Sequence, residues 1–204
     1  MQIHKPSQLS LEKQYWLSLK NGNPDGLEML YKLYSNPLYN YGSKFTADKD
    51  LIKECIQELF VNLWTRRTFI NHPSDVKNYL FKSFRHSVFK KAALLQKNEE
   101  YQEAENYAFS VVLNMEDSII SAEQNEALKR RLEKAVSKLT DRQREAIFLK
   151  FNENLSYDEV ADVMGISVKA TYKIMARSLG FLREHLSRED LAVLLSIFYL
   201  KLFN

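Results

Sequence analysis

A helix-turn-helix pattern in residues 155–174 constrains the fold of this chain more than any other feature. Ser156, followed three residues later by Glu159, has the form of a capping box, which satisfies the free N–H groups at the start of a helix. Gly165 occupies the turn, where a left-handed backbone is costly for any residue with a Cβ. Ser167 then predicts the N-cap of a second helix. The segment therefore predicts two helices joined by a tight turn.

The second helix of this pattern has a packed face and a basic face, an arrangement that fits the major groove of DNA. Its packed face is expected to hold Thr171, Ile174, Ser178 and Leu182. The residues predicted to face DNA are Ser167, Lys169, Tyr172, Lys173 and Arg177. An Arg or Lys side chain can bind a guanine or a phosphate, so the sequence leaves base reading and backbone contact open. Arg177 could also be an ordinary exposed charge.

The composition favours an all-α protein located in a reducing compartment. Gly (5) and Pro (4) are scarce among 204 residues, and no alternating strand pattern bounded by turns is present. The single cysteine, Cys55, excludes an internal disulfide. The first residues are polar and contain no apolar signal-peptide core, which favours a cytoplasmic protein.

Charge divides the chain into three blocks. Residues 1–97 carry 15 Lys or Arg and 8 Asp or Glu, a net charge of +7. Residues 98–127 carry 8 acidic and no basic residues, and residues 128–185 carry 12 basic and 8 acidic residues, a net charge of +4. Basic blocks suit nucleic acid, because neutralised phosphates release counterions. Simple solvation explains the N-terminal excess about equally well.

Hydrophobic periodicity predicts two small helical domains joined by an acidic linker. The domain boundaries are expected at residues 1–95, 96–124 (the linker) and 125–186, followed by an apolar tail at 187–204. Pro37 could kink the second helix. The tail is expected either to pack on the C-terminal domain or to dock another protein; its length and Lys201 make a membrane anchor the least favoured role. The expected helices are residues 9–20, 27–45, 48–67, 75–95, 125–138, 141–152, 157–164, 168–186 and, in the tail, 191–203.

Two further segments resemble motifs of the sigma-70 family of RNA polymerase sigma factors. Residues 53–64, KECIQELFVNLW, resemble the polymerase-binding helix of that family, usually written E-D-x-V-Q-E-x-F-x-x-x-W. Residues 139–148, LTDRQREAIF, resemble the opening of the fourth region, L-P-x-R-x-R-x-V-F, and the helix-turn-helix follows at the right distance. The order of the motifs and the small size are typical of the extracytoplasmic function (ECF) group.

The resemblance implies roles for particular residues of the N-terminal domain. It implies that the polar face of the third helix binds core RNA polymerase, through Glu54, Gln57, Glu58 and Asn62. It also implies that the 68–74 loop and the fourth helix melt and hold the −10 promoter element, whose unstacked bases and phosphates need aromatic and cationic side chains. The candidates are Phe69, Arg85, His86, Lys90 and Lys91, whereas Phe84 shares a stripe with Leu80 and Val88 and is expected in the core.

The sequence therefore predicts an alternative sigma factor that places its C-terminal domain on −35 DNA. No residue pattern suggests an enzyme, a cofactor or a metal: the four histidines lack metal-ligand spacing, and only one cysteine is present. Two rivals stay open, a stand-alone helix-turn-helix regulator with an N-terminal sensor or dimerisation domain, and an adaptor that binds only protein. The sequence also leaves open whether an anti-sigma factor binds.

Overall fold

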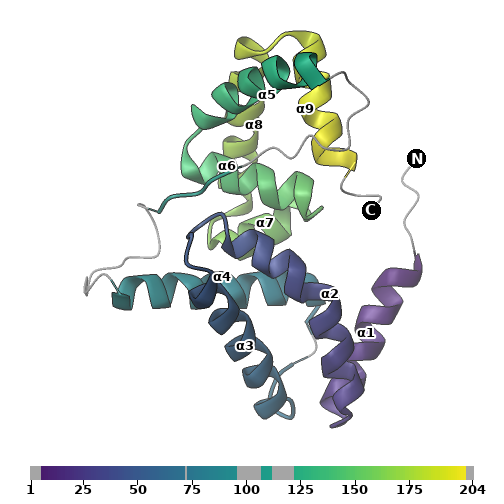
Figure 1. Ribbon diagram of the computed structural model, residues 1–204. Coiled ribbons are helices and arrows are strands. Elements are labelled where there is room, and N and C mark those ends of the chain that lie inside the picture. Colours follow the sequence, from purple (N-terminus) through teal and green to yellow (C-terminus); the bar gives the residue numbers. More distant parts are fainter. Residues whose placement is uncertain (1–5, 72, 96–106, 112–121, 201–204) are drawn as a thin grey trace. The chain divides into compact units, whose positions relative to one another are not determined.

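Helices make up most of the chain that the computed structural model describes, namely residues 6–71, 73–95, 107–111 and 122–200 (Figure 1). No strand occurs in these ranges, which confirms the predicted all-α fold. The chain forms two compact units, residues 1–105 and 106–204. The predictions for residues 1–5, 72, 96–106, 112–121 and 201–204 concern residues outside the described part.

Unit 1 contains α1 (Pro6–Lys20), α2 (Pro24–Gly42), α3 (Lys49–Thr65) and α4 (Val76–Leu95). The start of α2 lies three residues before the predicted one, because the Asn23 side chain accepts from the Asp25 N–H at 3.0 Å and Pro24 fits the first helical position. The helix continues past Pro37. Gly26 allows α1 and α2 to cross closely: a Cβ there would lie 2.5 Å from the Leu19 nitrogen.

Aromatic side chains fill the core of unit 1. Trp16, Tyr41, Phe81 and Phe84 are each at most 1% exposed. The rings of Tyr41 and Phe81 lie 5.3 Å apart, and α4 packs against all three other helices of the unit. The core position expected for Phe84 is therefore confirmed.

Unit 2 contains α5 (Ala122–Ser137), α6 (Asp141–Ile147), the short π-helix η1 (Phe148–Asn152), α7 (Tyr157–Met164), α8 (Val168–His185) and α9 (Arg188–Leu200). A capping box formed by Thr140 and Gln143 begins α6. The predicted helix over 141–152 is correct in extent, but its last part is wound as η1. Residues 107–111, within the predicted linker, pack onto this unit.

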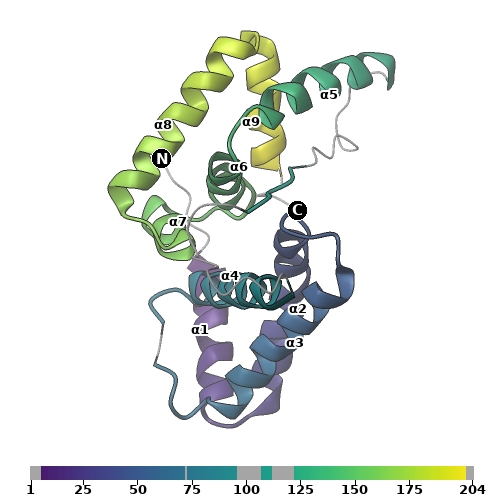
Figure 2. The same ribbon diagram turned by 90° about the vertical axis from the view of Figure 1, so that its left-hand side faces the viewer.

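The apolar tail folds as α9, which packs against α5, α8 and η1 (Figure 2). Leu194 is fully buried, and Arg131 of α5 holds Asp190 of α9 through two hydrogen bonds of 2.8 and 3.0 Å. Hydrogen bonding from Arg131 lowers the pKa of Asp190. At least this part of the tail therefore belongs to the core of unit 2. Among the described residues, no helix is long and apolar enough to cross a membrane.

Candidate nucleic-acid interface

The helix-turn-helix forms through the local contacts that the sequence predicts. Ser156 Oγ accepts from the Glu159 N–H at 3.2 Å, and Glu159 Oε2 accepts from the Ser156 N–H at 2.6 Å. Gly165 has φ +65°, the left-handed conformation that ends α7. Ser167 Oγ then accepts from the Ala170 N–H at 3.2 Å and begins α8. These contacts fix the direction in which α8 leaves the turn.

Helix α8 has one fully packed face and one exposed face. Thr171, Met175, Ser178 and Leu182 are at most 1% exposed, whereas Ile174, which was predicted on this face, is only half-buried. The Ser178 hydroxyl donates to the Ile174 carbonyl at 2.7 Å, so its burial leaves no unpaired group. All five predicted −35 residues lie on the exposed side: Ser167, Lys169, Tyr172, Lys173 and Arg177.

A second aromatic residue, which the sequence analysis missed, is half-buried beside this exposed surface. Tyr157 opens α7, and its ring lies 4.4 Å from that of Tyr172 with an interplanar angle of 30°. Lys150 lies 5.2 Å from the centre of the Tyr157 ring and donates to the Leu155 carbonyl at 3.0 Å. Tyr157 therefore restrains Tyr172, which is 55% exposed. The only signal in the sequence is that Tyr157 directly follows an N-cap.

The predicted polymerase-binding residues share the outward face of α3. Glu54, Gln57, Glu58 and Asn62 are all exposed, whereas Cys55, Ile56, Leu59, Phe60 and Leu63 form the buried face. The Lys91 Nζ atom lies 2.9 Å from Glu54 Oε1 and 2.8 Å from Glu58 Oε1. Desolvation works against the charge of Lys91, but hydrogen bonds to Glu58 and Glu54 outweigh it and raise the pKa of Lys91.

The predicted −10 residues divide into two groups. Phe69 is 87% exposed in the connection between α3 and α4, and His86 and Lys90 are exposed on α4. Arg85 is only 7% exposed, with its guanidinium 4.3 Å from the centre of the Phe89 ring, and Lys91 is held by the two α3 carboxylates. Phe69, His86 and Lys90 are therefore exposed, whereas Arg85 and Lys91 are engaged within unit 1.

Comparisons with known proteins agree with this arrangement. Residues 129–182 match the family model described as "Sigma-70, region 4". The chain is 29% identical over 147 residues to the ECF RNA polymerase sigma factor SigM of Bacillus subtilis (strain 168), covering 72% of this chain and 86% of SigM.

Two solved structures share the fold. CnrH, solved with the cytosolic domain of CnrY, superposes with a TM-score of 0.54 at 19% identity, covering 84% of this chain and 94% of that one. The sigma factor RpoE from Bartonella quintana, solved with the anti-sigma factor NepR, gives a TM-score of 0.51 at 18% identity, covering 77% and 94%. At these identities the likeness shows the fold alone.

The helix-turn-helix and these matches define a promoter-specificity factor of the sigma-70 family. Within that family, the chain belongs to the ECF group. It is an alternative sigma factor that acts in promoter recognition and transcription initiation with core RNA polymerase. Sigma factors are regulatory proteins rather than enzymes.

Proposed function

We propose that the two units divide the work of a sigma factor between them. Residues 1–95 bind core RNA polymerase and the −10 element, and residues 125–186 bind the −35 element. The observation that carries this division is the pair of exposed polar faces, one on α3 in unit 1 and one on α8 in unit 2. Polymerase carries out RNA synthesis, so this chain performs no catalysis of its own and acts in the cytoplasm with that enzyme.

On α8, Lys173 lies nearer the start of the helix and reads a base, whereas Arg177, one turn further on, binds a phosphate. Residues near the start of a recognition helix are those that reach base edges in helix-turn-helix proteins. Tyr172, restrained by Tyr157, presents an aromatic surface and a hydroxyl to the same groove. Ser167 and Lys169 complete the contact at the start of the helix.

On α3, Gln57 and Asn62 bind polymerase directly, together with the carboxylates of Glu54 and Glu58. Lys91 supports this face from α4, because its ammonium fixes both carboxylates. Glu54 and Glu58 remain about half exposed or more, with side-chain exposures of 62% and 48%, so each can still accept a hydrogen bond from a partner.

For the −10 element, Phe69 supplies a stacking surface for an unpaired base, and His86 and Lys90 bind the nearby strand. Stacking of a base on an aromatic side chain contributes about 1–3 kcal/mol. Arg85 acts indirectly by packing on Phe89 and holding the shape of α4.

An anti-sigma factor is a further proposed partner. CnrH and RpoE were both solved in complex with another protein, which in the case of RpoE is named an anti-sigma factor. The test is to isolate proteins that bind this chain and to measure whether each one prevents the chain from binding core polymerase. A bound protein that does so would support the proposal. If the chain still binds polymerase in the presence of every protein that it captures, the result counts against the proposal.

Two single variants test the division of work. Gln57→Ala should weaken binding to core polymerase in a competition assay, while Lys173→Ala should bind polymerase normally but initiate poorly at promoters that need a −35 element. Each variant serves as the control for the other, because both side chains are exposed and neither change should unfold the protein. Equal polymerase binding by the Gln57→Ala variant and the unmodified chain would overturn the α3 assignment. Tight, sequence-specific DNA binding by the free chain would overturn the dependence on polymerase.

A further inference from the structure

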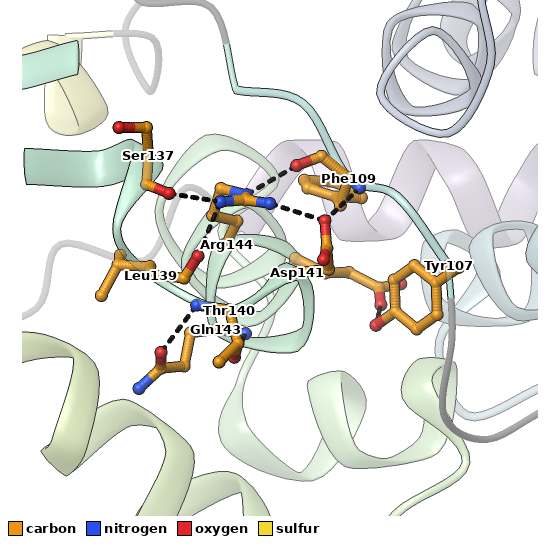
Figure 3. Close-up of polar contacts among 9 residues, drawn as sticks. Tyr107, Phe109, Ser137, Leu139, Thr140, Asp141, Gln143 and Arg144 are labelled. Carbon is orange, nitrogen blue, oxygen red and sulfur yellow. Dashed lines mark hydrogen bonds and ion pairs between the residues drawn. The ribbon is translucent and has the colours of Figure 1, made fainter. Parts of the chain in front are cut away.

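Residues 107–111 lie beside the helices of unit 2: Figure 3 shows Phe109 against Asp141 and Arg144 of α6, and the Phe109 ring also meets Phe148 of η1. The Phe109 side chain is 1% exposed, and its ring meets that of Phe148 edge to face, with centres 5.7 Å apart. Ala108 and Ser110, its two neighbours, are exposed. One side of this segment is therefore seated in unit 2 and the other faces solvent.

The main chain of Phe109 is held by an ion pair on α6. The Phe109 N–H donates to Asp141 Oδ1 at 2.6 Å, and Arg144 Nε donates to the Phe109 carbonyl at 2.7 Å (Figure 3). Arg144 and Asp141 are themselves paired at 2.6 Å. Both polar main-chain groups of one residue are thus bound by two side chains that orient each other.

Other contacts anchor this socket to the body of unit 2. Arg144 Nη1 donates to the carbonyls of Ser137 and Leu139 at 3.0 and 2.6 Å, so the guanidinium is fixed to the end of α5. The Tyr107 hydroxyl donates to the carboxylate of Glu145, a residue with no exposed surface. A buried carboxylate needs such a partner, so Tyr107 completes the socket.

We propose that residues 107–111 form a clasp that shortens the chain linking the two units and so limits the promoter spacings that the protein can bridge. With the clasp closed, eleven residues (96–106) separate Leu95 from Tyr107; with it open, twenty-six residues (96–121) separate Leu95 from Ala122. At about 3.5 Å per extended residue, these chains reach at most about 40 Å and about 90 Å.

The spacing role rests on the proposed assignment of unit 1 to the −10 element and unit 2 to the −35 element. Each added base pair of spacer moves the two elements about 3.4 Å further apart along the helix axis. A closed clasp therefore discriminates against long spacers, and an open clasp accepts them.

Three variants of the full chain distinguish the effect of opening the clasp from a general loss of stability. Phe109→Ala empties the apolar part of the socket, and Ala108→Ser changes an exposed neighbour as the matched control. In the third variant, a Gly/Ser insertion between Asn98 and Glu99, as long as residues 107–121, lengthens the linking chain without touching the socket.

Chymotrypsin, which cuts after aromatic residues, reports on the clasp itself. Cleavage after Tyr107 should be slow in the unmodified chain, in Ala108→Ser and in the insertion variant, and at least several-fold faster in Phe109→Ala. Equal cleavage rates in the unmodified chain and Phe109→Ala would show that the segment is not held, and would overturn the proposal.

The role of the clasp in promoter spacing is tested by measuring transcription with core polymerase on promoters that differ only in spacer length. Phe109→Ala and the insertion variant should both extend activity to longer spacers, while Ala108→Ser should keep the original profile. An unchanged profile for the insertion variant would overturn the spacing role even if Phe109→Ala folded poorly. Failure of the proposed function itself would look different: the unmodified chain would direct no promoter-dependent transcription at any spacing, although Tyr107 stayed protected.

Discussion

Helices α8 and α4 both carry basic residues that the sequence assigns to DNA, but these residues are exposed on α8 and partly buried or paired on α4. On α8, Lys169, Lys173 and Arg177 are all exposed. On α4, Arg85 is buried against Phe89, and Lys91 bridges two carboxylates of α3. Among the α4 candidates, only His86 and Lys90 face outward.

The difference lies in how the buried positions are distributed along each helix, and not in the number of neighbours, since α4 packs against three helices and α8 against four. The buried residues of α4 come in adjacent pairs, Leu80 with Phe81, Phe84 with Arg85 and Val88 with Phe89, so its packed surface is wider than a single stripe. The buried residues of α8, in contrast, repeat every three or four positions, and one broad face is left free. A charged residue is therefore a reliable guide to an exposed site only on a helix whose packing is confined to one stripe.

The largest expected effect concerns the packed side of α4. Phe84→Ala should lower the free energy of unfolding of unit 1 by about 3–5 kcal/mol, because it leaves a cavity in a fully buried site. Denaturant unfolding of the full chain would measure this loss. Phe69→Ala, at a side chain that is 87% exposed, is the matched control and should change stability by less than about 0.5 kcal/mol. Comparable losses for the two variants would contradict the contrast between core and exposed aromatic residues.

On the open face of α8, Lys173→Ala should cost about 1–3 kcal/mol in promoter binding and relax the preference at one base position. Arg177→Ala should instead weaken binding to all promoter sequences alike. It should also reduce the slope of log affinity against log salt concentration by about 1, the change expected for the loss of one phosphate contact. A scan of promoter variants with the polymerase complex, at two or more salt concentrations, distinguishes the two. If Lys173→Ala leaves the base preference unchanged, the proposed roles are reversed: Lys173 binds a phosphate and Arg177 reads a base.

Arg85→Met should lower the stability of unit 1 by about 1–2 kcal/mol, since it removes a cation stacked on an aromatic ring in a largely dry site. Lys90→Met, at an exposed position of the same helix, is the control and should leave stability nearly unchanged. If Arg85→Met keeps full stability but loses promoter melting, Arg85 contacts DNA after all and the contrast with α8 disappears.

Local patterns predicted much of this molecule, because the contacts involved lie close in sequence. The capping box of Ser156 and Glu159, the left-handed Gly165 and the core position of Phe84 all follow from spacings of a few residues. Contacts between distant segments were not predictable in this way. Lys91 meets Glu58 across 33 positions, and Phe109 meets Arg144 across 35.

The segment around Phe109 shows why such contacts are missed. It lies in an acidic stretch without helical periodicity, so composition assigns it to a linker. Its burial depends on a socket whose members come from α6 and η1, and only the folded unit brings those residues together. Tyr157 was missed for a related reason, since its partner Tyr172 lies on the next helix.

The smallest expected effect tests whether Lys91 supports α3 or binds DNA. Lys91→Met should cost about 1 kcal/mol or less at neutral pH, because the carboxylates that it pairs with are about half exposed or more and solvent screens the interaction. The pKa of Lys91 is raised in the folded protein, so its contribution is complete below the ordinary pKa of lysine and is lost as pH rises through the higher folded value. The difference in unfolding free energy between the unmodified chain and Lys91→Met should therefore shrink only in strongly alkaline solution. A double-mutant cycle with Glu58→Gln should show coupling between the two side chains. Absence of coupling, together with a loss of promoter binding at unchanged stability, would assign Lys91 to DNA and make α4 resemble α8.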